Sequence, residues 1–312
     1  MYRTITVVLG VAISGLIMGC NSNGEPRRIV FNKYPDMKLG FTTQNFINAL
    51  PVSVYNAKAF IDYADQQGYS WIELRDPEAS LTIEDCHTIA AYACDHNVEI
   101  IYSIQRGLLD SDFWDIFRRG IKNAAVFNGP GIYRALTTGK EFDTDPSKLG
   151  WNKAEFEQAL DTANRAADIA RDHGVRFAVE NSNGDIDGYS KPYYGLAEFF
   201  DTASSDVAWQ LDTANFFWVP SVEITARQAE SFTRKYASKI AYIHLKSARD
   251  RKALPILDGN PLDFETIFSI MNKNKVYYIA IELDAIKDEQ QIYRNQVASV
   301  DYLILNGFVS IK

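Results

Sequence analysis

The stretch VRFAVE, at residues 175–180, ends in Glu180 and opens a series of four short apolar runs. The later runs are VAWQLD, IAYIH and YYIAIE, and they end in Asp212, His244 and Glu282. Their β-branched and aromatic content predicts strands, and the end residues are 32, 32 and 38 positions apart, which is room for one strand, one helix and two loops. Consecutive βα units place these side chains at one rim of a closed parallel barrel, where active sites lie. Three carboxylates and one imidazole suit a divalent metal ion.

The rest of the chain continues this alternation. Strands are expected at 38–43, 70–75, 98–103, 121–126, 175–180, 207–212, 240–245 and 276–282. Helices are expected at 53–67, 82–96, 110–120, 152–174, 194–204, 223–238, 263–274 and 288–306. Gly68 and Gly174 stand where helix C-caps belong, and Asn152 and Asp263 stand where N-caps belong. Eight units of each kind predict an α/β fold, a (β/α)8 TIM barrel that forms a single domain from residue 37 to residue 312.

One segment interrupts the regular spacing. Residues 128–151, between the expected fourth strand and the next helix, contain Gly129, Pro130 and Gly131 and a charged middle. A loop of this length in a compact barrel is typical of a functional cover.

The composition excludes a nucleic-acid partner. The chain has 312 residues, of which 46% are hydrophobic, and this is enough to fill one barrel core. Its formal net charge is −8, and its basic residues form only short groups such as Arg118-Arg119 and the cluster Arg249, Arg251, Lys252. Binding to nucleic acid requires a basic stripe that neutralises phosphates.

The N-terminus predicts export. Residues 1–19 carry Arg3, an apolar stretch and a small residue directly before Cys20, which is the pattern of a signal peptide. The apolar stretch is short for a membrane span, and this favours cleavage. Residues 16–20 are similar to the lipobox of bacterial lipoproteins, in which the cysteine is lipidated, and residues 20–36 then form a polar tether. The membrane is expected as a partner only through this anchor, at the periplasm or cell surface; the alternative is an ordinary signal peptide with an incidental cysteine.

The order of short motifs along the barrel resembles a known family. The motifs are WIELRD with Glu73, AVEN with Glu180, LDTAN with Asp212, IHLK with His244 and Lys246, PILDGNPLDFETIF, and IELD with Glu282. Each one alone is a weak signal, but their order and spacing together are specific. From about Leu39 to the C-terminus, the chain resembles the xylose isomerase-like TIM barrel superfamily, in particular its sugar phosphate isomerase and epimerase branch.

The resemblance implies a metal site and an acid/base pair. It implies that Glu180, Asp212, His244 and Glu282 bind one divalent ion, which manganese, magnesium, zinc or cobalt could each supply. In related epimerases the first and last glutamates also exchange protons with the two faces of a substrate carbon. Glu180 and Glu282 are therefore the expected catalytic pair, in a reaction that removes a proton next to a sugar carbonyl through a metal-stabilised enediolate.

Departures from the family pattern argue against some of the reactions that members of the family catalyse. Many relatives have histidine three residues after the sixth-strand aspartate, whereas this chain has Asn215, which can bind a hydroxyl group but not relay a proton. The earliest histidine is His87, in an expected helix, so the two-metal hydride shift of true xylose isomerases is not expected. Four histidines in total cannot supply the three-zinc cluster of the apurinic endonuclease relatives.

Three further rim residues are candidates for sugar binding, each with a structural alternative. Glu73 could hydrogen-bond the substrate or orient a loop through Arg75. Lys246 points to the same side of its strand as the histidine two positions earlier, and could meet a substrate oxygen or form a rim salt bridge. Trp218, with Phe216, Phe217, Tyr193 and Tyr194, could form an apolar wall for a sugar face or pack loops.

The predicted export of the protein indicates which class of substrate to expect. Sugar phosphates are mainly cytoplasmic, whereas an exported protein meets free sugars, oligosaccharides and glycosides. A small-molecule sugar or glycoside is therefore the expected partner of a metal-dependent isomerase or epimerase. A metal-dependent lyase of 3-oxo-glycosides, which works by β-elimination, is an alternative with the same first step. A non-catalytic sugar-binding lipoprotein is the third hypothesis, and the oligomeric state is left open.

Overall fold

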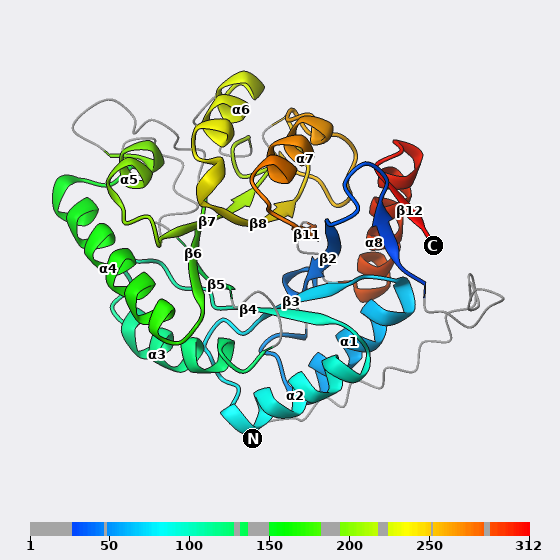
Figure 1. Cartoon of the computed structure of the whole chain (residues 1–312), viewed down its shortest axis with the longest axis horizontal. Coiled ribbons are helices and arrows are strands. Elements are labelled where there is room, and N and C mark those ends of the chain that lie inside the picture. Colours follow the sequence, from blue (N-terminus) through cyan, green and yellow to red (C-terminus); the bar gives the residue numbers. More distant parts are fainter. Residues whose placement is uncertain are drawn as a thin grey trace.

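A cylinder of parallel strands surrounded by helices forms the protein (Figure 1). The computed structural model describes residues 27–46, 49–127, 150–181, 194–217, 224–250, 252–283 and 288–312, together with the backbone of Ile132–Leu136. The wall strands are β2 (Lys38–Thr42), β3 (Trp71–Arg75), β4 (Glu99–Ser103), β5 (Ile132–Leu136), β6 (Arg176–Glu180), β7 (Ala208–Asp212), β8 (Ile240–Leu245) and β11 (Tyr278–Ile281). Neighbours in the order β5–β6–β7–β8–β11–β2–β3–β4 pair in parallel, and β4 lies beside β5. The predicted TIM barrel is confirmed.

A helix follows each wall strand and packs outside the cylinder. The helices are α1 (Val54–Gln67), α2 (Ile83–Asp95), α3 (Phe113–Ala124), α4 (Lys153–Asp172), α5 (Leu196–Thr202), α6 (Ala226–Lys235), α7 (Phe264–Lys273) and α8 (Glu289–Leu305). The predicted caps are confirmed: the side chains of Asn152 and Asp263 accept backbone amide protons, and Gly68 and Gly174 have φ values of +84° and +70°.

The barrel interior changes from apolar to polar along the strands. Below the rim, a separate cluster of buried side chains lies in the interior and includes Trp71, Ile101, Ala178, Ala208, Tyr242 and Ala280. Because side chains alternate between the two faces of a strand, the residues two positions further on also point inward. Those residues are Glu73, Ser103, Glu180, Gln210, His244 and Glu282, and all are buried. The fold therefore stacks a polar layer directly on an apolar one.

Gly40 on β2 makes room for the indole of Trp71. A Cβ atom at position 40 would lie 2.4 Å from the carbonyl oxygen of Trp71 and 2.6 Å from its ring. Gly40→Ala is expected to lower the free energy of unfolding by about 3 kcal/mol, at the upper end of overpacking effects, because neither a strand backbone nor a fully buried ring can move aside. Urea unfolding measures this change, and unaltered stability would show that β2 and β3 can separate.

The fourth wall strand is not where the sequence pattern placed it. Residues 121–126, predicted as a strand, end helix α3 and its following turn, and the strand is β5, inside the segment 128–151 that was predicted as a loop. A short apolar run cannot be distinguished from a buried helix segment by periodicity alone. The buried positions of α3 recur at helical spacing and include Phe113, Ile116, Phe117, Gly120, Ile121 and Ala124.

An additional strand precedes the barrel wall, in a segment that was predicted to be part of the tether. Ile29–Phe31, placed in the polar tether, forms β1, which pairs antiparallel with β2 and with β12 (Val309–Ile311). Ile29 and Phe31 are buried, so the tether prediction is wrong for this part of 20–36. The signal peptide at 1–19 and Cys20 lie outside the described residues. Within the described part of the chain, none of the helices combines the length and apolar character needed to span a membrane.

Candidate active site

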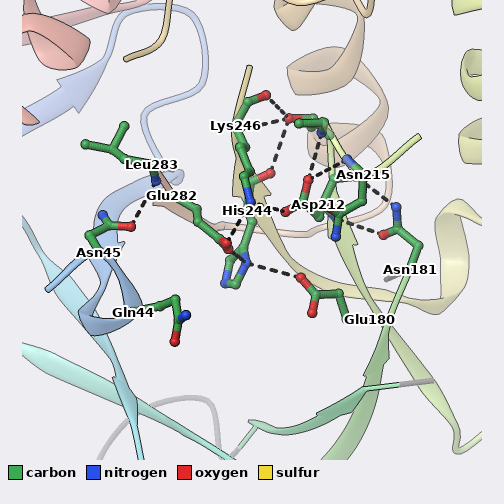
Figure 2. Close-up of polar contacts among 12 residues, drawn as sticks. Gln44, Asn45, Glu180, Asn181, Asp212, Asn215, His244, Lys246, Glu282 and Leu283 are labelled. Atoms are coloured by element: carbon green, nitrogen blue, oxygen red, sulfur yellow. Dashed lines mark hydrogen bonds and ion pairs between the residues drawn. The ribbon is translucent and has the colours of Figure 1, made fainter. Parts of the chain in front are cut away.

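The four expected ligands converge at the carboxyl ends of neighbouring strands. Glu180 ends β6, Asp212 ends β7, His244 lies on β8, and Glu282 directly follows β11. One potential donor atom from each lies within 4.8 Å of the others, and all four side chains are buried (Figure 2). Donors on opposite sides of one ion, each about 2.0–2.6 Å from it, lie roughly 4–5 Å apart. The donor set and its spacing therefore fit a single divalent ion.

One oxygen of Asp212 is held by the backbone, and the other is left for an ion. The amides of Ala214 and Asn215 donate to Oδ1 at 2.7 and 2.9 Å. Oδ2 is buried without a hydrogen bond from any described residue, and Nζ of Lys246 lies 4.0 Å away. Burial raises the pKa of Asp212 to about 7, against the positive charge of Lys246 and with the help of Glu282. A divalent ion at Oδ2 would hold this carboxylate in its ionised form.

Glu73 orients the imidazole of His244. Oε2 of Glu73 lies 2.5 Å from Nε2 of His244, and the hydroxyl of Tyr242 donates to Oε1 of Glu73 at 3.1 Å. Since Nε2–H donates to a carboxylate, Nδ1 is the nitrogen left to bind an ion. Nδ1 contacts Oε2 of Glu282 and lies 3.7 Å from Oε1 of Glu180. The pairing of Glu73 with His244 was not among the roles expected from the sequence; the expected contact with Arg75 is a longer ion pair of 3.8 Å.

Glu73→Gln is expected to weaken metal binding about 10- to 100-fold, because the carboxylate behind a ligating histidine fixes its tautomer and raises its basicity. Glutamine keeps the size and an acceptor oxygen but loses the charge. Calorimetric titration with Mn²⁺ measures the change, and Glu84→Gln, at an exposed position of α2, is the matched control. Equal affinities in the two variants would contradict the role given to Glu73.

The affinity for metal is also expected to fall as the pH is lowered. Burial lowers the pKa of His244, but the negative charges of Glu73 and Glu282 outweigh burial and hold the pKa well above its ordinary value. Without an ion, both ring nitrogens therefore carry protons at neutral pH. An ion at Nδ1 displaces one of them, so the apparent affinity should drop about tenfold for each unit of falling pH, and more steeply below about pH 7, where Asp212 also takes up a proton. Titrations at several pH values test this, and an affinity independent of pH would contradict it.

Lys246 forms the salt bridge that was one of its two expected roles. Nζ donates to Oε1 of Glu282 at 3.0 Å. The hydroxyl of Thr213 donates to the carbonyl of Lys246 at 2.7 Å, and Nδ2 of Asn260, from the motif PILDGNPLDFETIF, donates to the same carbonyl at 2.5 Å. Burial raises the pKa of Glu282, but Lys246 and His244 pull it well below its ordinary value. Glu282 is therefore ionised and able to accept a proton.

Two buried asparagines fix the backbone beside the expected ligands, and the sequence interpretation gave them no role. Nδ2 of Asn181 donates to the carbonyl of Asp212 at 2.9 Å, and Oδ1 accepts from the amide of Asp212 at 2.8 Å (Figure 2). In the same way, Nδ2 of Asn45 donates to the carbonyl of Ile281 at 3.1 Å, and Oδ1 of Asn45 accepts from the amide of Leu283 at 2.9 Å. Asn45 thus holds the backbone on both sides of Glu282. The sequence signal that could have identified these two residues is an asparagine shortly after the end of a strand.

The remaining predicted sugar-binding residues have different outcomes. Oδ1 of Asn215 is buried and has no hydrogen bond from the described residues, so it can accept one from a ligand. Phe216, one of the aromatic residues expected beside a sugar, instead packs against Trp209 and Phe232 in the core. Trp218 lies outside the described residues.

The chain belongs to the xylose isomerase-like TIM barrel family, whose model matches residues 61–301. The resemblance stated from the sequence motifs is confirmed at this level. A search of curated proteins finds no significant match.

Solved structures of similar fold include sugar isomerases and epimerases. A sugar phosphate isomerase/epimerase from Parabacteroides distasonis ATCC 8503 has a TM-score of 0.62 at 16% identity, covering 88% of this chain and 96% of its own. D-psicose 3-epimerase from Clostridium cellulolyticum H10, solved with D-tagatose, has a TM-score of 0.59 at 15% identity, covering 86% and 99%. A xylose isomerase-like TIM barrel protein from Mycobacterium smegmatis, in complex with magnesium, has a TM-score of 0.63 at 15% identity, covering 86% and 96%.

Proposed function

We propose that this protein is a divalent-metal-dependent sugar isomerase or epimerase that removes a proton next to a carbonyl group. The observation that carries the proposal is the convergence of Glu180, Asp212, His244 and Glu282, whose donor atoms lie within 4.8 Å of one another. Membership of the family and the sugar epimerases among the structural neighbours support it.

Glu180 and Glu282 are the proposed acid/base pair. Both reach Nδ1 of His244, Glu180 from the end of β6 and Glu282 from the residue after β11 (Figure 2). A bound divalent ion would supply positive charge next to an oxygen that becomes negative as its neighbouring carbon loses a proton. Glu282, held ionised by Lys246, accepts the proton on one face, and Glu180 returns a proton on the other. Each positioned carboxylate contributes about 10²- to 10⁴-fold to the rate.

The location of the protein is a second part of the proposal. The signal-like segment 1–19 and the lipobox-like residues ending in Cys20 support export and a lipid anchor. Mass spectrometry of the N-terminal peptide from bacterial membranes tests it: a diacylglyceryl-modified Cys20 is expected, and an unmodified residue 20 in a released protein would contradict it.

Turnover assays with manganese, a ketose and a 3-oxo-glycoside test the reaction. Conversion of the ketose to its epimer or aldose isomer, abolished by a chelator and restored by metal, is the expected result. Release of the aglycone without net epimerisation would instead show a β-eliminating lyase. Sugar binding without turnover of either compound would show a non-catalytic sugar-binding lipoprotein on this barrel.

A further inference from the structure

Arg75 and Ser103 form a second polar position at the barrel mouth, on the half of the wall that does not carry the four ligands. The ligand strands β6, β7, β8 and β11 are consecutive in the sheet, and β3 and β4 lie in the other half. Arg75 pairs in register with Ser103, at the carboxyl ends of β3 and β4. Both side chains point inward, because Arg75 is two positions after Glu73 and Ser103 is two positions after Ile101.

The hydrogen-bonding capacity of both residues is largely unused. Arg75 is 2% exposed and Ser103 is 0% exposed. Nη1 of Arg75 donates to Oε1 of Gln44 at 3.2 Å, but Nε and Nη2 have no hydrogen-bond partner among the described residues, and neither does Oγ of Ser103. A buried donor left unpaired costs about 1–3 kcal/mol, and more when it is charged. A bound acceptor would therefore satisfy these donors, and the described protein atoms do not provide one.

The carboxylate that forms an ion pair with Arg75 among the described residues is engaged elsewhere. Oε1 of Glu73 lies 3.8 Å from Nη2, beyond hydrogen-bond distance, because Glu73 binds His244 with one oxygen and Tyr242 with the other. The unpaired groups Nε and Nη2 lie on one edge of the guanidinium. That edge presents two parallel N–H bonds, which match the two oxygens of a carboxylate.

A phosphate fits this position less well than a carboxylate does. A phosphate carries up to two charges and three strong acceptor oxygens, so it favours a group of cations. Lys246, the other buried lysine or arginine described at this rim, is already paired with Glu282 and lies near Asp212. One edge of one arginine, with one hydroxyl beside it, matches a single planar carboxylate.

We propose that Arg75 and Ser103 bind the carboxylate of an acidic sugar whose carbonyl end lies at the Glu180–Asp212–His244–Glu282 cluster. This inference rests on the proposed function, since it names the substrate class of the same site. The substrate spans the mouth of the barrel, with its carbonyl end at the half formed by β6, β7, β8 and β11 and its acid group at the half that contains β3 and β4. A ketose whose terminal CH₂OH is oxidised to a carboxylate has this arrangement.

Matched ligand pairs test the inference by binding rather than turnover. D-fructuronate and D-fructose differ only in the terminal group, and so do D-tagaturonate and D-tagatose. Calorimetry with the metal-loaded protein is expected to show at least one acid bound about 10- to 100-fold more tightly than its neutral partner, the range expected for a charge-assisted hydrogen-bonded pair. Equal affinity within both pairs, or no binding of either acid at millimolar concentration, overturns the inference.

Substitutions assign the effect to residues. Arg75→Gln is expected to remove the preference for the acid while leaving the affinity for the neutral ketose unchanged, and Ser103→Ala to reduce the preference several-fold. Arg75→Lys, which keeps the charge but loses the fork, is expected to retain part of it and provides the test if Arg75→Gln does not fold. Arg118→Gln, at an exposed position of α3, is the matched control. Equal losses for acid and neutral ligand in the Arg75 and Ser103 variants would show a structural role only and overturn the inference.

Binding and turnover separate this inference from the proposed function. An acid bound through Arg75 but not converted contradicts the proposed reaction and leaves the inference intact. Turnover of neutral ketoses by the unsubstituted protein, together with no preference of that same protein for either acid, supports the reaction and overturns the inference.

Discussion

Replacing Glu282 by glutamine is expected to reduce turnover by about 10²- to 10⁴-fold while the protein stays folded and still binds sugar. Glutamine keeps an oxygen that can face the ion, but it cannot accept a proton from a substrate carbon. Glu282 contacts Lys246 and His244, which keep it ionised. The substitution leaves these two residues in place and keeps the size of the side chain at position 282. Turnover is measured at saturating metal, so that a weaker metal site does not imitate a loss of catalysis.

Solvent deuterium exchange sharpens this experiment. If Glu282 and Glu180 act on opposite faces, Glu282→Gln and Glu180→Gln should each lose exchange from a different epimer of the substrate. Glu157→Gln, on the exposed face of α4, is the matched control and should leave both exchange and turnover unchanged. Full turnover in Glu282→Gln at saturating metal would remove Glu282 from the catalytic pair and leave it, at most, a ligand.

The positions of the four expected ligands could be predicted because each depends on local pattern alone. A buried parallel strand is read from a continuous apolar run, and a polar residue that ends such a run must lie at the rim of the barrel. The runs before Glu180, Asp212 and His244 all have this form, and the structure brings their ends together. Strand β5 does not have a continuous apolar run, because its sequence IYRAL contains an arginine. The more apolar sequence AAVF nearby belongs to the end of α3 and the turn after it. Local pattern therefore selected the wrong segment.

The contacts that tune the site depend on distances across the barrel, which no local pattern encodes. Glu73 meets a histidine 171 positions later, and Asn45 meets the backbone amide of a residue 238 positions later. The sequence showed that Glu73 and Asn45 are polar residues near strand ends, but their partners follow from the closure of the cylinder. The same holds for Arg75, whose unpaired edge becomes visible only when Glu73 is seen to be engaged by His244 and Tyr242.

Replacing Lys246 by methionine is expected to lower the free energy of unfolding of the metal-free protein by about 3–5 kcal/mol, the range found when one partner of a buried ion pair is removed. Lys246 lies among Glu282, Asp212 and Glu180, and its Nζ pairs directly with Glu282. Methionine preserves the apolar stem but removes one cation from this acidic cluster and leaves Glu282 without its lysine partner.

A divalent ion should compensate for much of this loss, because it brings positive charge to the same carboxylates. Ligand binding to the folded state alone stabilises by about 2.7 kcal/mol at a concentration 100 times the dissociation constant. Urea unfolding with chelator and with Mn²⁺ should therefore show a larger metal-induced gain in Lys246→Met than in the unsubstituted protein at the same free Mn²⁺ concentration, because the variant should bind the ion more tightly once the competing cation is removed. Lys235→Met, which removes an exposed ion pair with Asp201, is the matched control and should change stability by less than about 1 kcal/mol in either condition. The same metal-induced gain in both variants would mean that the ion does not share these carboxylates with Lys246, and the metal site would have to lie elsewhere.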